Sequence, residues 1–291
     1  MNAQIPIVIP RNIVYKSFGR GHGGIVRLMS PGDLGKLLKP FVFLDLFSAP
    51  AEFAGSMPLH PHSGIATITV ITEGNFRFDD PQSGQGYLGY GGVEWMRAGG
   101  GVWHGKELSA GTSPHVKGFQ LWIALPAALE NGPVDSQYIE AADMPATGPA
   151  RVIVGAYDGV QSPVRAPDGI NYLLVTLKAG QRWSYVPPSG HEVGWLAVSH
   201  GGLVGAHPVE AGEMAIFERG TATIELEGAP GGDTVFVLAS AVPHPHELVT
   251  GYYSVHTSAE ALAEGEARIA ELRGRLTSDP NAPGMVPVFK G

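Results

Sequence analysis

The chain has 291 residues, enough for two domains of ordinary size, and it contains no cysteine. Disulfide bonds, thiolate metal sites and cysteine nucleophiles are therefore excluded, so any metal ligands must be nitrogen or oxygen atoms. A formal net charge of −8, with 44% hydrophobic and 16% charged residues, argues against both direct nucleic-acid binding and wholesale disorder.

Short runs rich in β-branched and aromatic residues follow one another along the chain, separated by many of its 41 glycines and 24 prolines. Many short strands with regular turn signals predict an all-β sandwich or barrel rather than alternating strands and helices. The clearest runs lie at residues 66–74, 119–126, 150–157, 172–180, 194–201, 213–220 and 234–240.

A segment rich in Pro, Ala and Gly at residues 126–149 separates two β-rich halves. We therefore predict two domains, at residues 1–130 and 131–291. One helix is predicted near the end, because Thr257-Ser258-Ala259-Glu260 is a capping-box signature. The apolar residues that follow recur at helical spacing, and we interpret the helix as an element that docks on one domain: Leu262, Ile269, Leu272 and Leu276.

The motif His60-Pro61-His62 is the most informative feature of the sequence. Side chains alternate across a strand, so the two imidazoles point to the same face and can reach one ion. A third imidazole, His104, lies in the Gly-rich segment GGGVWHGKEL. Three histidines on one metal leave coordination positions open, as a catalytic site requires. The alternative is a relict constellation held by hydrogen bonds.

Other histidines and aromatic residues have weaker claims. His244-Pro245-His246 repeats the spacing but lacks a third ligand, and His115 fits a surface loop near the barrel mouth. The remaining candidates in the second half have loop-like positions whose spacing does not support a second site: His191, His200 and His207. Five aromatic residues could wall a pocket for a planar substrate, although ordinary core is the more frequent explanation: Phe43, Phe47, Phe53, Trp95 and Trp103.

Several segments, taken in order, resemble the pirin family of bicupins: FVFLDLF, PLHPHSGIATITVITEG, GGVEWMRAGGGVWHGKEL, GFQLWIALP, YLLVTLKAGQ and AVPHPHELVTGYYSVHTSAEAL. The resemblance covers nearly the whole chain. It implies two stacked cupin β-barrels with a C-terminal helix, the N-terminal barrel in residues 1–130 holding a metal. The second barrel and the helix would occupy residues 131–291. The resemblance also implies a monomer.

The family's ligands are two histidines of an HPH motif, then a histidine and a glutamate separated by one residue. These positions fall on His60, His62, His104 and Lys106, so a lysine stands where the family has its glutamate. Glu107 is next in sequence. A one-residue shift on a strand turns a side chain to the opposite face, unless a bulge near Gly105 re-aims it.

Three states of the site stay open on this basis: three histidines plus water, a site that includes Glu107, or an empty site. A Lys106 side chain pointing inward would repel a divalent cation. A second acidic position of the family, four residues after the HPH motif, is Ala66 here. If the site is filled, the resemblance implies one divalent ion, with iron expected and nickel, copper, zinc and manganese also compatible with nitrogen ligands.

Two functions follow from the resemblance, and the sequence leaves open whether the protein is an enzyme. The first is a quercetin 2,3-dioxygenase-like enzyme acting on a flavonol or similar planar phenol, with the three histidines on the metal and Glu107 as general base. The second is a non-catalytic redox- or metal-sensing regulator that binds protein partners. Other cupin chemistries are a weaker third class.

The compartment is predicted from what the sequence does not contain. The first residues show no basic segment followed by a long apolar run, and no stretch reaches the roughly 18 apolar residues of a membrane span. The expectation is a soluble, cytoplasmic protein without a membrane or nucleic-acid partner.

Overall fold

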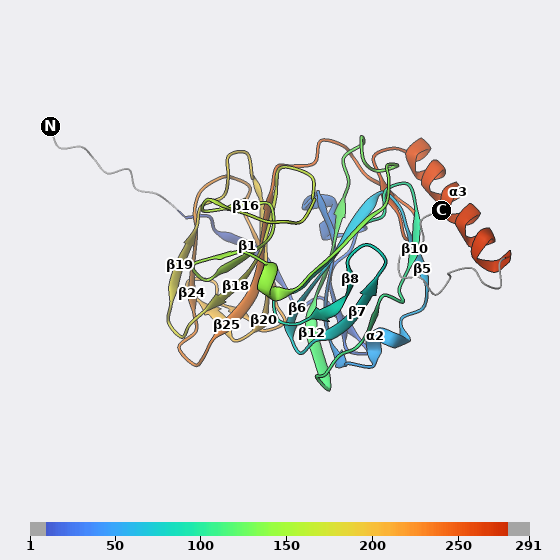
Figure 1. The fold of residues 1–291 in the computed structure, drawn as a ribbon. Helices are drawn as coiled ribbons and strands as arrows, with labels where there is room; N and C mark the ends of the chain where they lie inside the picture. Colours follow the sequence, from blue (N-terminus) through green and yellow to red (C-terminus); the bar gives the residue numbers. More distant parts are fainter. Residues whose placement is uncertain (1–9, 279–291) are drawn as a thin grey trace.

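A computed structural model describes residues 10–278 of the chain. The regular structure of the described chain consists mostly of antiparallel strands, with one long helix, α3 (Ala259–Ser278), at its end (Figure 1). The predicted all-β fold is confirmed. Three short helical turns complete the elements: α1 (Leu34–Leu37), α2 (Phe53–Ser56) and the 3-10 turn η1 (Ala141–Asp143).

The first half of the chain forms one large sheet and two small ones. The large sheet has the order β13-β9-β6-β12-β4-β3-β2. Its strands are β2 (Arg20–His22), β3 (Ile25–Met29), β4 (Phe41–Pro50), β6 (Ile65–Glu73), β9 (Val93–Arg97), β12 (His115–Ala124) and β13 (Asp135–Ile139). The small sheets pair β5 (His60–His62) with β10 (Val102–His104), and join β7 (Phe76–Asp80) to β8 (Gly84–Leu88) and β11 (Leu108–Ala110).

The second half repeats this plan with a large sheet in the order β1-β23-β20-β25-β18-β15-β14. Its strands are β1 (Ile13–Ser17), β14 (Ala146–Thr147), β15 (Ala150–Val154), β18 (Ile170–Leu177), β20 (Val193–His200), β23 (Met214–Phe217) and β25 (Thr234–Ala241). The opposing sheet holds β19 (Arg182–Tyr185), β21 (Gly202–Val204), β22 (Val209–Glu210) and β24 (Ile224–Gly228). Two short hairpins are β16 (Ala156–Tyr157) with β17 (Val160–Gln161), and β26 (Val249–Thr250) with β27 (Val255–His256).

The two large sheets pack face to face, and alternation along each strand decides what reaches the barrel interiors. On β12, Phe119 and Leu121 belong to the apolar core that joins the two sheets. Their neighbours Gln120 and Trp122 point to the other face, into the interior of the first barrel. The core between the sheets therefore fixes the strands whose opposite faces line the site.

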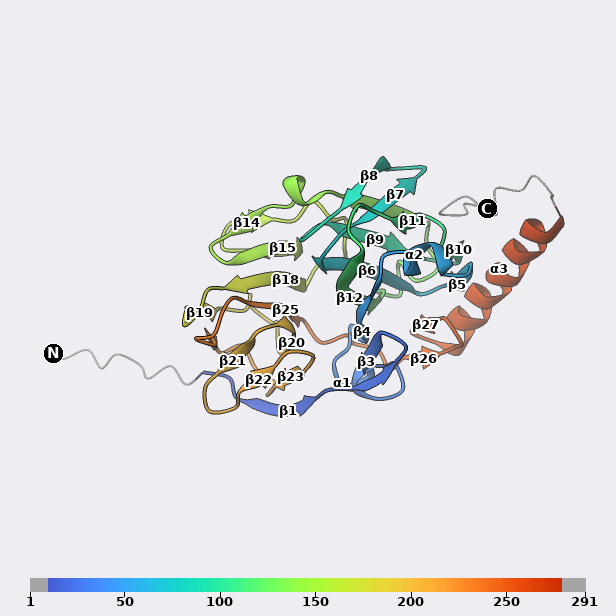
Figure 2. The ribbon, with the colours of Figure 1, turned by 90° about the horizontal axis from the view of Figure 1, so that it is seen from below.

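Each half of the chain contributes a strand to the large sheet of the other half. β1, near the start of the described chain, pairs with β23 of the second sheet, while β13, which follows residue 130, pairs with β9 of the first. At the other end, α3 lies against β10, where Nε1 of Trp103 donates to the carbonyl of Ile269 at 2.9 Å (Figure 2). Strand pairing thus crosses the boundary predicted between residues 130 and 131.

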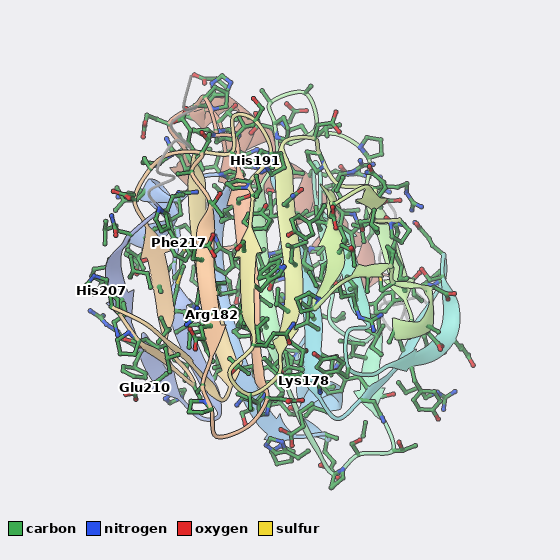
Figure 3. All side chains as sticks on the ribbon, turned by 90° about the vertical axis from the view of Figure 1, so that its left-hand side faces the viewer. Lys178, Arg182, His191, His207, Glu210 and Phe217 are labelled. Atoms are coloured by element: carbon green, nitrogen blue, oxygen red, sulfur yellow. The ribbon has the colours of Figure 1, made fainter. Side chains whose placement is uncertain are left out.

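The second barrel has a packed apolar interior that includes Leu173, Tyr185 and Phe236. Figure 3, which views this end of the molecule, places His191 and His207 far apart on it. His191 is engaged by Ser240, with 2.8 Å between Nδ1 and Oγ, and Nε2 of His200 lies 2.8 Å from Glu73 of the first barrel. Within residues 10–278, these histidines do not gather into a metal-binding group.

Candidate metal centre

Strands β5 and β10 bring the three predicted histidines together. The two strands are antiparallel, with His104 opposite His60 and Val102 opposite His62. His60 and His62 face the same side of β5, as the alternation predicts. One ligand atom from each of the three imidazoles lies within 4.8 Å of the other two. The HPH motif and the Gly-rich segment therefore meet as one cluster.

Hydrogen bonds orient all three rings in the same way. Nδ1 of His60 lies 2.9 Å from the Pro58 carbonyl, and Nδ1 of His62 lies 3.1 Å from the Tyr253 carbonyl. Nδ1 of His104 lies 2.7 Å from Oε1 of Glu107. The two carbonyl oxygens can only accept a hydrogen bond, and so can the Glu107 carboxylate when it is ionised. The Nδ1 atoms therefore carry the protons, and the Nε2 lone pairs are left for an ion.

The residues present fit a divalent metal ion. Nε2 of His104 is buried and has no hydrogen-bond partner within the described chain. A buried ring nitrogen without a partner costs free energy unless something binds it. Neutral imidazole nitrogens are the usual ligands of zinc, iron, nickel and copper, and a coordinated ion would satisfy this atom together with its two neighbours.

The surroundings lower the pKa of two of the imidazoles and raise the pKa of the third. Burial, with a smaller contribution from neighbouring imidazoles, lowers the pKa of His60 to about 4 and that of His62 well below its ordinary value. Both are therefore neutral at neutral pH. His104 is as deeply buried as His62, and this desolvation lowers its pKa, but the charge and hydrogen bond of Glu107 together with the charge of Glu94 outweigh it, so the pKa of His104 is raised. An ion must displace a more tightly held proton there.

The turn after β10 decides where Glu107 goes. β10 ends at His104, and Gly105 has a φ of +122°, a backbone conformation that favours glycine. The Glu107 carboxylate returns to His104, is 4% exposed, and its Oε2 also accepts from the backbone N–H groups of Gly105 and Lys106 at 2.7 and 2.6 Å. Gly105 thus re-aims Glu107 in the manner expected of a bulge.

Lys106 is turned away from the cluster. Its ammonium donates to the backbone carbonyl of Met57 at 2.7 Å, and the residue is exposed. The repulsion expected for an inward-pointing lysine does not arise in this arrangement. Lys106 therefore contributes neither a ligand nor a buried charge to the cluster.

A pocket opens beside the histidines in the first barrel. Its apolar wall includes Phe47, Phe53, Met57, Phe76, Leu108 and Tyr138, and its polar lining includes Asp45, His60, Thr69, Glu94, His104, Glu107 and Gln120. Two of the five aromatic residues considered from the sequence thus line it. The others pack elsewhere: Phe43 stacks on Trp122, Trp95 lies in the core between the sheets, and Trp103 contacts α3.

Glu94 is a site residue that sequence reasoning missed. It stands on β9, is 3% exposed, and its Oε2 accepts from Thr69 Oγ1 at 2.6 Å. Desolvation by burial raises the pKa of its carboxyl to about 7. The available signal was a single acid among apolar residues in Val93-Glu94-Trp95-Met96, a strand that reads as fully buried.

The remaining histidines do not join the cluster. His115 is part-exposed near Glu73 at the far end of β12. Nε2 of His244 lies 3.3 Å from the Leu125 carbonyl, and the His244 and His246 ring centroids are 5.7 Å apart. In residues 10–278, the three histidines of β5 and β10 form the group of acidic or histidine side chains that could hold an ion. No helix in this range is long and apolar enough to cross a membrane.

Comparison with known proteins places these features in a family. A family model described as Pirin matches residues 25–123. A Pseudomonas aeruginosa protein named "Putative quercetin 2,3-dioxygenase" is 33% identical over 238 residues, which cover 76% of this chain and 82% of the relative. A pirin-like protein of Caulobacter vibrioides is 34% identical over 224 residues, covering 69% of this chain and 79% of the relative.

Solved structures share the fold. The crystal structure of a quercetin 2,3-dioxygenase from Acinetobacter baumannii has a TM-score of 0.78 at 24% identity, covering 92% of this chain and 98% of its own. The nickel(II) complex of the bacterial pirin YhhW from Escherichia coli has a TM-score of 0.59 at 15% identity, covering 77% of this chain and 94% of its own. At these identities the likeness establishes the shared architecture.

Proposed function

The chain belongs to the pirin family of bicupins, and from this premise we propose that it is a metal-dependent dioxygenase that acts on a flavonol or a similar planar phenol. The observation that carries the proposal is the convergence of three imidazoles, two of which, His60 and His104, line an aromatic-walled pocket. Open coordination positions beside an apolar pocket are what a metal-assisted oxidation of a small aromatic substrate requires.

His60, His62 and His104 are the proposed ligands, through their Nε2 atoms. A divalent ion bound there would supply Lewis-acid and redox chemistry to the phenolic oxygen and dioxygen. Iron remains the proposed ion, and nickel, copper, zinc and manganese suit the same nitrogen set. The nickel complex of the Escherichia coli relative motivates testing nickel alongside iron.

Glu107 is the carboxylate proposed from the sequence to assist catalysis. Its contacts favour an action through His104, because Oε1 holds Nδ1 of that ring and Oε2 accepts two backbone N–H groups. A carboxylate in this position fixes the tautomer of the imidazole and strengthens the basicity of Nε2. The apolar wall of the pocket, which includes Phe47, Phe76 and Tyr138, would hold the planar rings of the substrate and exclude water.

The proposal is tested by mixing quercetin with iron- or nickel-loaded protein in air-saturated buffer while the dissolved dioxygen concentration and the quercetin absorbance are followed. We expect both to fall together with the wild-type protein and with Lys106→Ala, whose ammonium lies outside the pocket lining. His104→Ala is expected to be inactive. Constant absorbance with fully metal-loaded wild-type protein would contradict the proposal and favour the regulatory alternative.

A further inference from the structure

Four polar side chains stand in one row across the interior face of the first large sheet. Strand register places Glu94 of β9 opposite Thr69 of β6, Thr69 opposite Gln120 of β12, and Gln120 opposite Asp45 of β4. All four line the pocket. Period-two alternation explains the row, because their chain neighbours pack into the core between the sheets: Trp95, Ile68, Leu121 and Leu44.

Glu94 has acceptor capacity to spare at the end of this row. Its Oε2 is held by Thr69 Oγ1 at 2.6 Å, whereas its Oε1 has only a long contact of 3.4 Å from Thr67 Oγ1. A carboxylate offers about four lone-pair sites, so most of the capacity of Oε1 is unused. Glu94 also stands apart from the ion-holding group, which consists of the three histidines.

The other carboxylates that line the pocket are already engaged. Glu107 accepts three hydrogen bonds, from Nδ1 of His104 and from two backbone N–H groups. Asp45 forms an ion pair with the Arg27 guanidinium, which contacts both of its oxygens. Glu94 is therefore the buried carboxylate of this pocket whose oxygen is free to meet a ligand.

We propose that Glu94 accepts the proton of a phenolic hydroxyl on a planar ligand whose polar edge lies along this row. The inference rests on the proposed function and specifies its substrate contact. The phenolic O–H bond breaks, an O–H bond forms on Oε1 of Glu94, and the negative charge passes from the carboxylate to the phenolic oxygen. The transfer itself requires no oxidant or reductant.

Two further observations support this assignment. The pKa of Glu94, raised to about 7 by burial, lies where a general base works best at neutral pH. Gln120 also lines the pocket, two strands from Glu94 in the same row, so its side-chain amide can meet a second polar atom of the ligand. The row therefore offers the ligand one proton acceptor, Glu94, and one amide side chain, Gln120.

The test follows the protonation state of a bound flavonol directly. 3-Hydroxyflavone, which has a single hydroxyl group, is added without dioxygen to metal-free protein near neutral pH, and its absorption distinguishes the neutral from the anionic form. Removing the metal excludes the ion as the cause of ionisation. We expect the wild-type protein to bind the anion and Glu94→Gln to bind the neutral form. The control Lys106→Ala, whose ammonium lies outside the pocket lining, is expected to retain the anion.

Glu94→Ala gives a second variant that removes the carboxylate without adding an amide, and added acetate is expected to restore the anionic band. An anionic ligand bound to Glu94→Gln would overturn the assignment. If the metal-loaded wild-type protein consumes quercetin in air while Glu94→Gln still binds the anion, only this inference fails. A wild-type protein that neither binds flavonol nor consumes it overturns the inference and the proposed function together.

Discussion

Nδ1 of His104 and Oε1 of Glu107 lie 2.7 Å apart, with both side chains buried, and this pair couples the turn after β10 to the candidate metal centre. The carboxylate occupies a position behind the imidazole, on the side away from Nε2. In the proposed function, Glu107 therefore acts through the orientation and basicity of His104, one of the three proposed ligands.

Glu107→Gln is expected to weaken metal binding by about 10- to 100-fold, the usual cost of losing an outer-shell partner. The amide can still accept from Nδ1, but its NH₂ group then faces the backbone donors of Gly105 and Lys106. The measurement is competitive zinc titration of the metal-free protein. Wild-type affinity in this variant would show that the His104 pair does not support the site.

Lys106→Met is expected to leave metal content unchanged. The Lys106 ammonium binds the Met57 carbonyl and is exposed, so removing its charge alters neither the ligands nor the buried electrostatics. Elemental analysis of the two proteins, purified in parallel, makes the comparison. A marked rise in metal content in the variant would mean that the lysine does act on the centre.

Burial of the Glu94 carboxyl is expected to make the stability of the protein depend on pH. Burial raises the pKa of Glu94 from 4.5 to about 7, so the folded protein holds this proton more tightly than the unfolded chain. The stabilisation from this proton is fully present below the pKa that Glu94 has in the unfolded chain. It is lost as the pH rises through the pKa that Glu94 has in the folded protein. Relative to Glu94→Gln, metal-free wild-type protein should lose up to about 3 kcal/mol between about pH 5 and about pH 8.

Urea unfolding of both proteins at several pH values provides this measurement. Comparing the two proteins at each pH removes the contributions of the histidines, whose pKa values also shift on folding. A constant difference in the free energy of unfolding across the range would mean that Glu94 is not held protonated by burial.

The C-terminal helix fits closely over the back of the HPH strand. Ser63 Oγ lies 2.9 Å from His256 Nε2, and a Cβ on Gly265 of α3 would lie 2.6 Å from Ser63 Oγ and 2.7 Å from His256 Nε2. Gly265→Ala should therefore destabilise the protein by about 1–3 kcal/mol through overpacking. The matched change Gly274→Ala meets no atom within 4 Å and should stabilise the helix by about 0.5–1 kcal/mol.

Thermal unfolding distinguishes the two alanine variants. Equal effects of both substitutions would contradict the tight contact at Gly265. Because Ser63 follows His62 directly, the Gly265 variant is also expected to bind zinc more weakly than the Gly274 variant.

Features of this site that depend on neighbouring residues can be predicted from the sequence, whereas features that depend on distant residues cannot. The common orientation of His60 and His62 is local, because alternation along one strand sets it. The family resemblance adds His104. The orientation of Glu107 depends on the +122° φ at Gly105, which spacing alone does not determine.

Glu94 required more than local information. Its place in the pocket depends on the register between β9 and β6, and on the packing that turns Trp95 into the core between the sheets. Likewise, Trp95 and Trp103 lie close to His104 in sequence, but they pack against the second large sheet and α3 respectively. The all-β fold was predictable because strand and turn signals repeat along the whole chain.

The central claim is that the three histidines hold one divalent ion. Elemental analysis of untagged protein, reconstituted with iron or nickel and freed of excess metal, tests it directly. We expect about one equivalent of metal per chain in the wild-type protein, and its loss in His60→Ala and in His104→Ala. Metal far below one equivalent in correctly folded wild-type protein, or full retention in both variants, would contradict the account.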